Sequence, residues 1–154
     1  MPAQDNTRIA RGVYDAYNKR DFNAAAKLAS EGFEGHDMTM GEIMHGPEGV
    51  KKDLERWAKA FPDSKADIVR TGATEDGAVV EFTGHGTHTG PLDTPAGPIA
   101  ATNKKVELSF CDVMEIRNGL ITSQRRYWDA NTLMRQLGLA PEQAATPAAG
   151  VKRT

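Results

Sequence analysis

The chain has almost no cysteine, no long hydrophobic run and little net charge. Cys111 is the only cysteine among 154 residues, which excludes an internal disulfide and is typical of a reducing compartment. No apolar run approaches the roughly 20 residues of a membrane helix, and the first residues lack the apolar core of a signal peptide. A formal net charge of −2 gives no basis for nucleic-acid binding. We therefore expect a cytoplasmic protein with neither membrane nor nucleic acid as a partner.

The size and composition predict one folded domain. Apolar residues make up 39% of the chain and charged residues 26%, which is enough apolar surface to bury a core. A length of 154 residues is that of a single domain. The segment 141–154 is rich in Ala, Pro and Gly, as flexible ends often are. We predict one domain over residues 1–140 and a flexible tail over 141–154.

The first third of the chain shows helical periodicity. Helices are expected over residues 7–20 and 22–30, and a third begins at Gly46-Pro47, because proline suits a first helical turn. This third helix carries an apolar stripe with spacings of four, three and four residues, formed by Val50, Leu54, Trp57 and Phe61. A short strand over residues 32–40 would hold His36.

From residue 66 onward the periodicity changes to two, which is typical of strands. Strands are predicted over 66–74, 78–88, 106–116 and 120–128, followed by a short helix that Asp129 begins and Gly138 ends. The segment 90–105 has no period and is predicted to be a loop at the mouth of a site. Helices followed by antiparallel strands make an α+β pattern, in which a curved sheet could enclose a pocket.

One carboxylate interrupts the apolar row of strand 106–116. The inward positions of that strand are Val106, Leu108, Phe110, Asp112, Met114 and Ile116. Burying a carboxylate destabilises the folded state, so a buried carboxylate usually has an ion-pair partner or a role at a functional site. Asp112 is therefore either a proton-transfer group or one half of a structural pair with an arginine. Phe110 and Met114 would flank it.

The histidines provide a second candidate group. His88 falls on the apolar face of its strand, where it could orient a carbonyl, shuttle a proton or sit hydrogen-bonded in the core. His85 lies three residues earlier and points to the other face, so the two do not form a metal pair. No metal site is expected. The spacing of Gly84, Gly86 and Gly90 does not match a dinucleotide-binding loop.

Several aromatic residues could either line a pocket for a flat polycyclic ligand or form plain core. These residues are Tyr14, Tyr17, Trp57 and Trp128.

A set of short motifs resembles the SnoaL-like polyketide cyclase family, within the nuclear transport factor 2-like superfamily. The motifs are Tyr17-Asn18-Lys19-Arg20-Asp21, His36-Asp37, His45-Gly46-Pro47-Glu48-Gly49, Phe61-Pro62-Asp63, Gly86-Thr87-His88-Thr89-Gly90, Asn118-Gly119-Leu120-Ile121, Tyr127-Trp128-Asp129 and Arg135-Gln136-Leu137-Gly138. The resemblance covers about residues 7–140. It implies a cone-shaped α+β barrel, with a curved antiparallel sheet packed on N-terminal helices around a deep apolar pocket. It also implies no cofactor, and a homodimer or higher homo-oligomer formed through the outer face of the sheet.

The resemblance also implies a reaction. Cyclases of this family close a ring by an intramolecular aldol reaction on a polyketide ester. Their acid/base aspartate stands in a His-x-Asp pair on the last strand. The positions in this chain that correspond to the pair are Gln124 and Arg126, so the chain departs from the pattern where the acid is expected. Asp129 matches a later aspartate at the start of the helix, and N-capping explains it equally well.

The turn at residues 117–119 decides which side chains face Asp112. A two-residue Asn118-Gly119 turn places Arg125 opposite Asp112, with Tyr127 on the same face. A three-residue loop pairs Ile116 with Leu120 and turns Gln124, Arg126 and Trp128 inward. The resemblance favours the three-residue loop, because the family's pair faces the pocket.

Two functions remain open. The first is a cofactor-free cyclase, isomerase or lyase that moves a proton on an apolar carbonyl compound. Its catalytic groups would be Asp112, His88 and Arg126. The residues that would bind the substrate are Gln124, His36, Tyr14, Trp57, Phe110, Met114 and Trp128. The second function is a non-catalytic protein that holds a hydrophobic small molecule or serves as a dimeric scaffold. A buried titratable group at the pocket favours the enzyme, which is the reading that we prefer.

Overall fold

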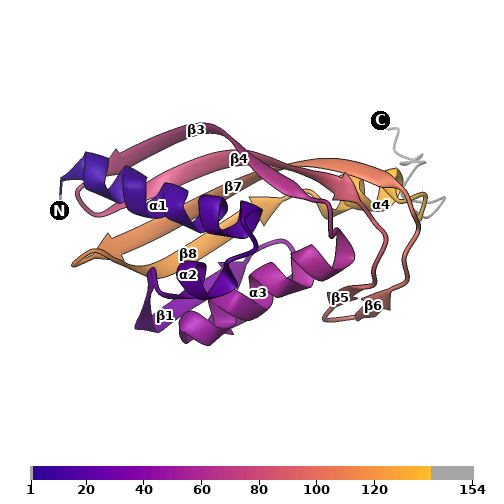
Figure 1. Cartoon of the computed structure of the whole chain (residues 1–154), viewed down its shortest axis with the longest axis horizontal. Coiled ribbons are helices and arrows are strands. Elements are labelled where there is room, and N and C mark those ends of the chain that lie inside the picture. The colour runs from indigo at the N-terminus through magenta and orange to yellow at the C-terminus, as the bar shows by residue number, and fades with distance from the viewer. Residues whose placement is uncertain (1, 140–154) are drawn as a thin grey trace, which may run out of the picture.

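A curved six-stranded sheet forms the main layer of the protein in the computed structural model, which describes residues 2–139 (Figure 1). The strand order is β2-β1-β8-β7-β4-β3. The strands are β1 (Ala29–Asp37), β2 (Glu42–His45), β3 (Lys65–Thr74), β4 (Gly77–Thr87), β7 (Lys105–Arg117) and β8 (Leu120–Trp128). The predicted segment 141–154 lies outside the described residues.

The helices cover the concave side of this sheet. They are α1 (Ala3–Asn18), α2 (Phe22–Ala26), α3 (Gly46–Ala60) and α4 (Ala130–Gln136). Helix α1 packs on β3 and β4, and α3 packs on β1 (Figure 1). The predicted α+β class is therefore confirmed. All strand pairs in the sheet are antiparallel except β1 with β8, which run parallel.

Three features of the chain differ from the sequence prediction. The helix expected over residues 22–30 ends at Ala26, and β1 already begins at Ala29. Strand β2 was not predicted, because only Met44 of its four residues is buried and so short a strand shows no alternation. The loop 90–105 contains a small hairpin formed by β5 (Leu92–Thr94) and β6 (Gly97–Ile99). Leu92 is fully buried, and β5 packs on α3. None of the loop's residues lines the cavity described below.

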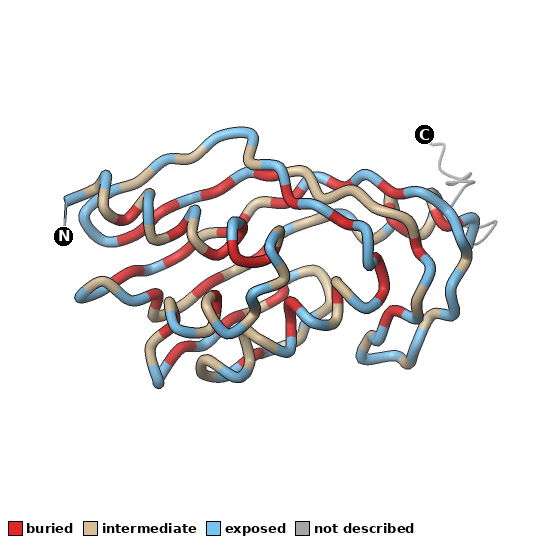
Figure 2. The backbone as a smooth tube through the Cα atoms, viewed as in Figure 1, coloured by how far each residue is buried: buried red, intermediate tan, exposed pale blue. Residues whose placement is uncertain are grey.

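The alternation of β7 is confirmed along its whole length. All six inward side chains from Val106 to Ile116 are buried, including Asp112, which has no exposed surface. Figure 2 shows the same alternation of buried and exposed positions on the neighbouring strands. Period-two patterning therefore fixes the buried face of the sheet.

The turn between β7 and β8 differs from both predicted alternatives. Asn118 and Gly119 have positive φ values of 52° and 79°, and Arg117 pairs with Leu120, so the turn has two residues and the predicted three-residue loop is wrong. A bulge at Thr122 then adds one residue to β8, which shifts the register by one. Asp112 therefore lies opposite Arg126 rather than Arg125 or Gln124. The expected inward direction of Gln124 and Arg126 is nevertheless correct, since both are buried.

The two capping predictions at α4 are confirmed. The Asp129 carboxylate accepts hydrogen bonds from the backbone N–H groups of Asn131 and Thr132, and Gly138 has a φ of 75° after the helix end. Over residues 2–139, no helix is long and apolar enough to cross a membrane.

Candidate functional site

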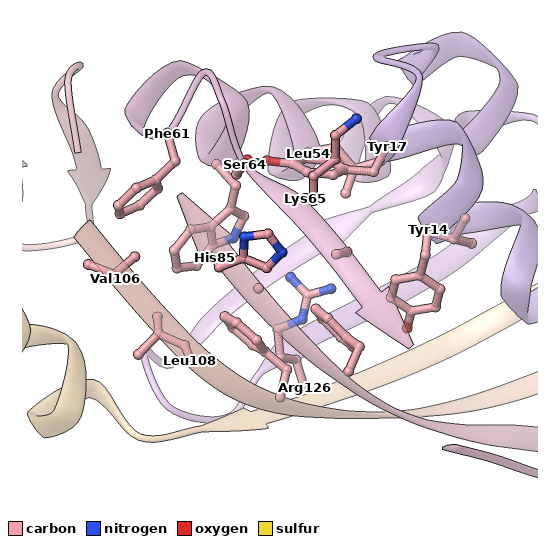
Figure 3. A pocket seen from close by; sticks show the side chains of 16 residues that line it. Tyr14, Tyr17, Leu54, Phe61, Ser64, Lys65, His85, Val106, Leu108 and Arg126 are labelled. Carbon is pink, nitrogen blue, oxygen red and sulfur yellow. Dashed lines mark hydrogen bonds between the residues drawn. The ribbon is translucent and has the colours of Figure 1, made fainter. Parts of the chain in front are cut away.

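A mostly apolar cavity of about 70 Å³ lies between the helices and the sheet (Figure 3). Helices α1 and α3 form one wall, and strands β3, β4, β7 and β8 form the other. The lining residues are Val13, Tyr14, Tyr17, Leu54, Trp57, Phe61, Ser64, Lys65, Ala66, Phe82, Gly84, His85, Val106, Leu108, Phe110 and Arg126. Three of the four aromatic residues considered in the sequence analysis therefore line the cavity: Tyr14, Tyr17 and Trp57.

The cavity is too small for the flat polycyclic ligand that we considered. An engineered cavity of about 150 Å³ is what holds one benzene molecule in a well-studied case. The volume of about 70 Å³ is less than half of that. A ligand of the size of benzene or larger therefore enters only in part, or with movement of the lining side chains.

The Arg126 guanidinium is the one permanently charged group buried in the cavity wall. It extends from β8 into the space between the sheet and the helices (Figure 3). Its Nε donates to Oδ1 of Asp112 at 2.8 Å and its Nη2 donates to Oδ2 at 2.9 Å, a bidentate pair. The carbon of the guanidinium lies 5.6 Å from the ring centroids of both Phe82 and Phe110. Packing and hydrogen bonds therefore fix its position.

Asp53 of α3 completes the cluster, and the sequence analysis missed it. The Nη1 atom of Arg126 donates to Oδ2 of Asp53 at 3.2 Å, whereas Oδ1 of Asp53 is buried and has no hydrogen-bond partner within the described chain. Asp53 precedes Leu54 and lies four residues before Trp57, so it shares the inner face of α3. A carboxylate inside that apolar stripe was the signal that could have identified it.

Tyr14 joins the cluster from α1. Its hydroxyl donates to Oδ2 of Asp112 at 2.6 Å. Burial and the charge of Asp112 both raise the pKa of Tyr14 well above its usual value, so this hydroxyl stays neutral and remains a donor. Both carboxylate oxygens of Asp112 thus accept strong hydrogen bonds, one of them from two donors.

The cluster contains a second arginine at its edge. Asp53 and Asp112 both contact the guanidinium of Arg126, and Oδ1 of Asp53 also lies 3.8 Å from Nη1 of Arg56, an ion pair. Burial alone would lower the pKa of Arg126, but Asp112 and Asp53 together raise it, so the guanidinium stays charged. Burial raises the pKa of Asp53, although Arg126 and Arg56 act in the opposite direction. Burial therefore favours the protonated form of Asp53 relative to an exposed aspartate.

Arg126 retains hydrogen-bonding capacity toward the cavity. A guanidinium has five N–H donors. Three of them serve Asp112 and Asp53, which leaves two, one on each terminal nitrogen. No described side chain accepts from these two N–H groups. A carbonyl or enolate oxygen of a ligand in the cavity could accept from them.

The structure brings together some of the predicted site residues. Tyr14, Trp57, Phe110 and Arg126 line the cavity, and Asp112 lies directly behind Arg126. Gln124 and Met114 face each other on β8 and β7, two residues beyond the Asp112–Arg126 pair, in the core rather than on the cavity wall.

The remaining predicted residues lie elsewhere. His88 is fully buried behind Phe61, where its Nδ1 accepts from the backbone N–H of Thr102, and burial lowers its pKa. It therefore stays neutral, and it does not line the cavity, so it is not placed for the catalytic role that the sequence analysis gave it. His36 is half-buried and contacts Glu34 near the surface. The indole N–H of Trp128 donates to Asp37, away from the cavity wall.

His85 borders the cavity from β4, but its ring is already engaged. Its Nε2 lies 2.7 Å from Oδ2 of Asp67, and both side chains are substantially exposed. His85 also borders a neighbouring groove lined by Asp67, Thr83 and Thr87. No group of three potential metal ligands occurs among residues 2–139.

Comparison with known proteins identifies the relatives of this chain. The family model described as SnoaL-like polyketide cyclase matches residues 7–137. No curated protein matches the chain.

Solved structures share the fold at low sequence identity. TsrD from Streptomyces laurentii superposes with a TM-score of 0.77 at 22% identity, over 90% of this chain and 98% of that one. A candidate polyketide cyclase from Xanthomonas campestris has a TM-score of 0.73 at 22% identity, over 88% and 98% of the two chains. A hypothetical protein from Catenulispora acidiphila with a ketosteroid isomerase-like fold, solved with trimethylamine, has a TM-score of 0.71 at 19% identity, over 86% and 93%.

The buried cluster gives a stability prediction. Arg126→Met leaves the buried Asp112 without its cation and removes one of the two arginines that pair with Asp53, which should lower the free energy of unfolding by about 3–5 kcal/mol in a urea titration. Arg125→Met is the matched control, because the neighbouring arginine makes no ion pair in the described chain, and it should change stability by about 0.5 kcal/mol or less. Replacing Arg126, Asp112 and Asp53 together by Met, Leu and Leu should recover much of the loss. Equal effects of Arg126→Met and Arg125→Met would contradict this account.

Asp53 gives a pH prediction. Its pKa in the folded protein is raised above the ordinary value of 3.8, so between these two values the folded state binds a proton that the unfolded state has released. The contribution of Asp53 to stability is therefore largest below pH 3.8 and falls as the pH rises through the folded pKa. The stability difference between wild type and Asp53→Asn should decline over this window in urea titrations at several pH values. A difference that rises with pH would contradict the prediction.

Proposed function

Because the chain belongs to the SnoaL-like polyketide cyclase family, we propose that it is a cofactor-free enzyme that moves a proton on a compact apolar carbonyl compound. One observation carries the proposal. A buried guanidinium with two uncommitted N–H groups stands in the wall of an otherwise mostly apolar cavity. An arginine fixed in this way can hold an oxygen on which negative charge develops.

Arg126 is proposed to bind the carbonyl oxygen of the substrate. Its hydrogen bonds to that oxygen would strengthen as the carbonyl becomes an enolate, and the dry surroundings would make them stronger than in water. Asp112 and Tyr14 are proposed to position the guanidinium. The sequence suggested that Asp112 itself moves the proton. Its two oxygens already accept from Arg126 and Tyr14, which favours the positioning role instead.

Asp53 is the better candidate for the proton-transfer group. A ligand oxygen on the free N–H of Nη1 would lie next to this carboxyl group, because the same nitrogen contacts Oδ2 of Asp53. Its Oδ1 accepts no hydrogen bond within the described chain and lies 3.8 Å from Nη1 of Arg56, and the raised pKa makes the carboxylate a stronger base than an exposed aspartate.

The proposed steps conserve the proton. Asp53 takes a proton from the carbon next to a carbonyl, and the electron pair moves to the oxygen held by Arg126. The enolate carbon then attacks a second carbonyl of the same molecule and forms a carbon–carbon bond. Asp53 returns its proton to the oxygen of that second carbonyl. An isomerase would return the proton to a different carbon instead.

A second candidate function is the binding of a small apolar molecule without catalysis. One observation favours it: Asp53 and Asp112 both stand behind Arg126 rather than on the cavity wall. In that case Arg126 would only orient a ligand oxygen.

Hydrogen–deuterium exchange separates the two functions. 2-Pentanone in deuterated buffer exchanges the protons next to its carbonyl slowly, and NMR follows their loss. The enzyme should accelerate this exchange over buffer, and acid/base catalysis contributes a factor of about 10²–10⁴ in typical enzymes. Asp53→Asn and Arg126→Lys should remove most of the acceleration, because lysine lacks the planar fork of donors. Arg125→Lys is the control and should retain it.

Each result of the exchange experiment discriminates between the candidates. Saturable binding of 2-pentanone without any acceleration would contradict the enzyme and support the binding protein. Acceleration that Asp112→Asn abolishes and Asp53→Asn leaves unchanged would return the proton-transfer role to Asp112.

The outer face of the sheet is proposed to form a homodimer. Val69, Val79 and Tyr127 are exposed there, and Cys111 lies beside Tyr127 on the same face. This mixture of apolar and polar side chains suits a moderately polar interface. Sedimentation at micromolar concentration should show a species of twice 16.7 kDa, and Val79→Glu should shift it toward the monomer. A wild-type chain that sediments only as a monomer would contradict the proposal.

A further inference from the structure

The indole N–H of Trp57 is a buried hydrogen-bond donor without a partner. Trp57 lines the cavity and is 9% exposed, and no described group accepts from its Nε1. Such donors are rare in folded proteins, because an unpaired buried group loses its hydration without compensation. The only other tryptophan, Trp128, shows the usual arrangement, since its Nε1 donates to both carboxylate oxygens of Asp37 at 3.1 Å.

The surrounding rings hold the Trp57 side chain in place. Its ring stacks on Phe61, with 6.2 Å between the ring centroids. It makes edge-to-face contacts with Phe110 and Trp128, at centroid distances of 5.8 Å and 5.5 Å. A ring packed on three sides cannot rotate to find an acceptor in the protein. Trp57 lies on the cavity wall, so an acceptor for its N–H could come from a ligand in the cavity.

Trp57 and Arg126 flank the same aromatic ring. Phe110 contacts Trp57 on one side and lies 5.6 Å from the guanidinium carbon of Arg126 on another. Both side chains line the cavity, so one ligand could contact both of them. The other polar groups there are largely committed, since Tyr17 pairs with Ser64 at 2.6 Å and Tyr14 donates to Asp112.

We propose that Trp57 is a specificity-determining residue that binds a second oxygen of the substrate, so that the site takes compact compounds with two carbonyl oxygens. This inference rests on the proposed role of Arg126, which binds the first oxygen. A cavity whose free polar groups are mainly donors selects acceptor oxygens. A compound that lacks the second oxygen leaves the indole N–H without an acceptor and is bound less well.

Matched ligands test the proposal. 2,4-Pentanedione has two acceptor oxygens and 2-pentanone has one, on the same carbon chain. The wild-type protein should bind the dione roughly tenfold more tightly than the monoketone, as expected for one additional hydrogen bond. Trp57→Phe keeps an aromatic ring but removes the donor, and it should reduce this ratio to about one. The ratio cancels any general loss of packing, because both ligands are measured on the same variant.

NMR of the wild-type protein provides a measurement that needs no variant. The chain has two indole N–H signals, and the dione should shift that of Trp57 while that of Trp128 serves as the internal reference. A Trp57 signal that the dione leaves in place, or a dione preference that persists in Trp57→Phe, overturns the proposal. If the dione shifts the Trp57 signal but the exchange of 2-pentanone is not accelerated, the binding role of Trp57 is supported and the proposed catalytic function is contradicted. If exchange is accelerated without a dione preference, the catalytic function stands and the role of Trp57 fails.

Discussion

The bidentate ion pair between Arg126 and Asp112 is the interaction on which the site depends. Each group alone would be costly to bury, so each requires the other. The pair joins β7 to β8, and the further contacts to Asp53 and Tyr14 tie both strands to α3 and α1. The cluster thus connects the sheet to the two helices that form the opposite wall of the cavity. It sets the position of the guanidinium within a mostly apolar space.

The bulge at Thr122 makes this pairing possible. A two-residue Asn118-Gly119 turn without a bulge would place Arg125 opposite Asp112, and Arg126 would then point outward. The extra residue moves the register by one, so that Arg126 lies opposite Asp112 and faces inward. A local irregularity of one residue therefore decides which of two adjacent arginines is buried. This is a physical reason to regard the bulge as part of the site.

Most of the fold could be predicted from the sequence, because its signals are local. The alternation in β7, the stripe on α3 and the cap at Asp129 each report the environment of their own segment. For the pairing of Asp112 with Arg126, only the inward direction of the Arg126 side chain could be predicted, not the register that places it opposite Asp112. The turn type and the bulge are both compatible with the same residues, and neither leaves a clear pattern. Asp53 was missed because a carboxylate on a helix is usually exposed. The size of the cavity depends on how distant side chains pack, which no local pattern records.

The central claim is that the free N–H groups of Arg126 bind a carbonyl oxygen in the cavity. Nitrogen-15 NMR of the arginine side chains tests it most directly, in wild-type protein titrated with 2-pentanone. The account predicts that the guanidinium signals of Arg126 shift with saturable dependence on the ketone, whereas those of the neighbouring Arg125 do not. Ketone binding that leaves the Arg126 signals unchanged would contradict the account.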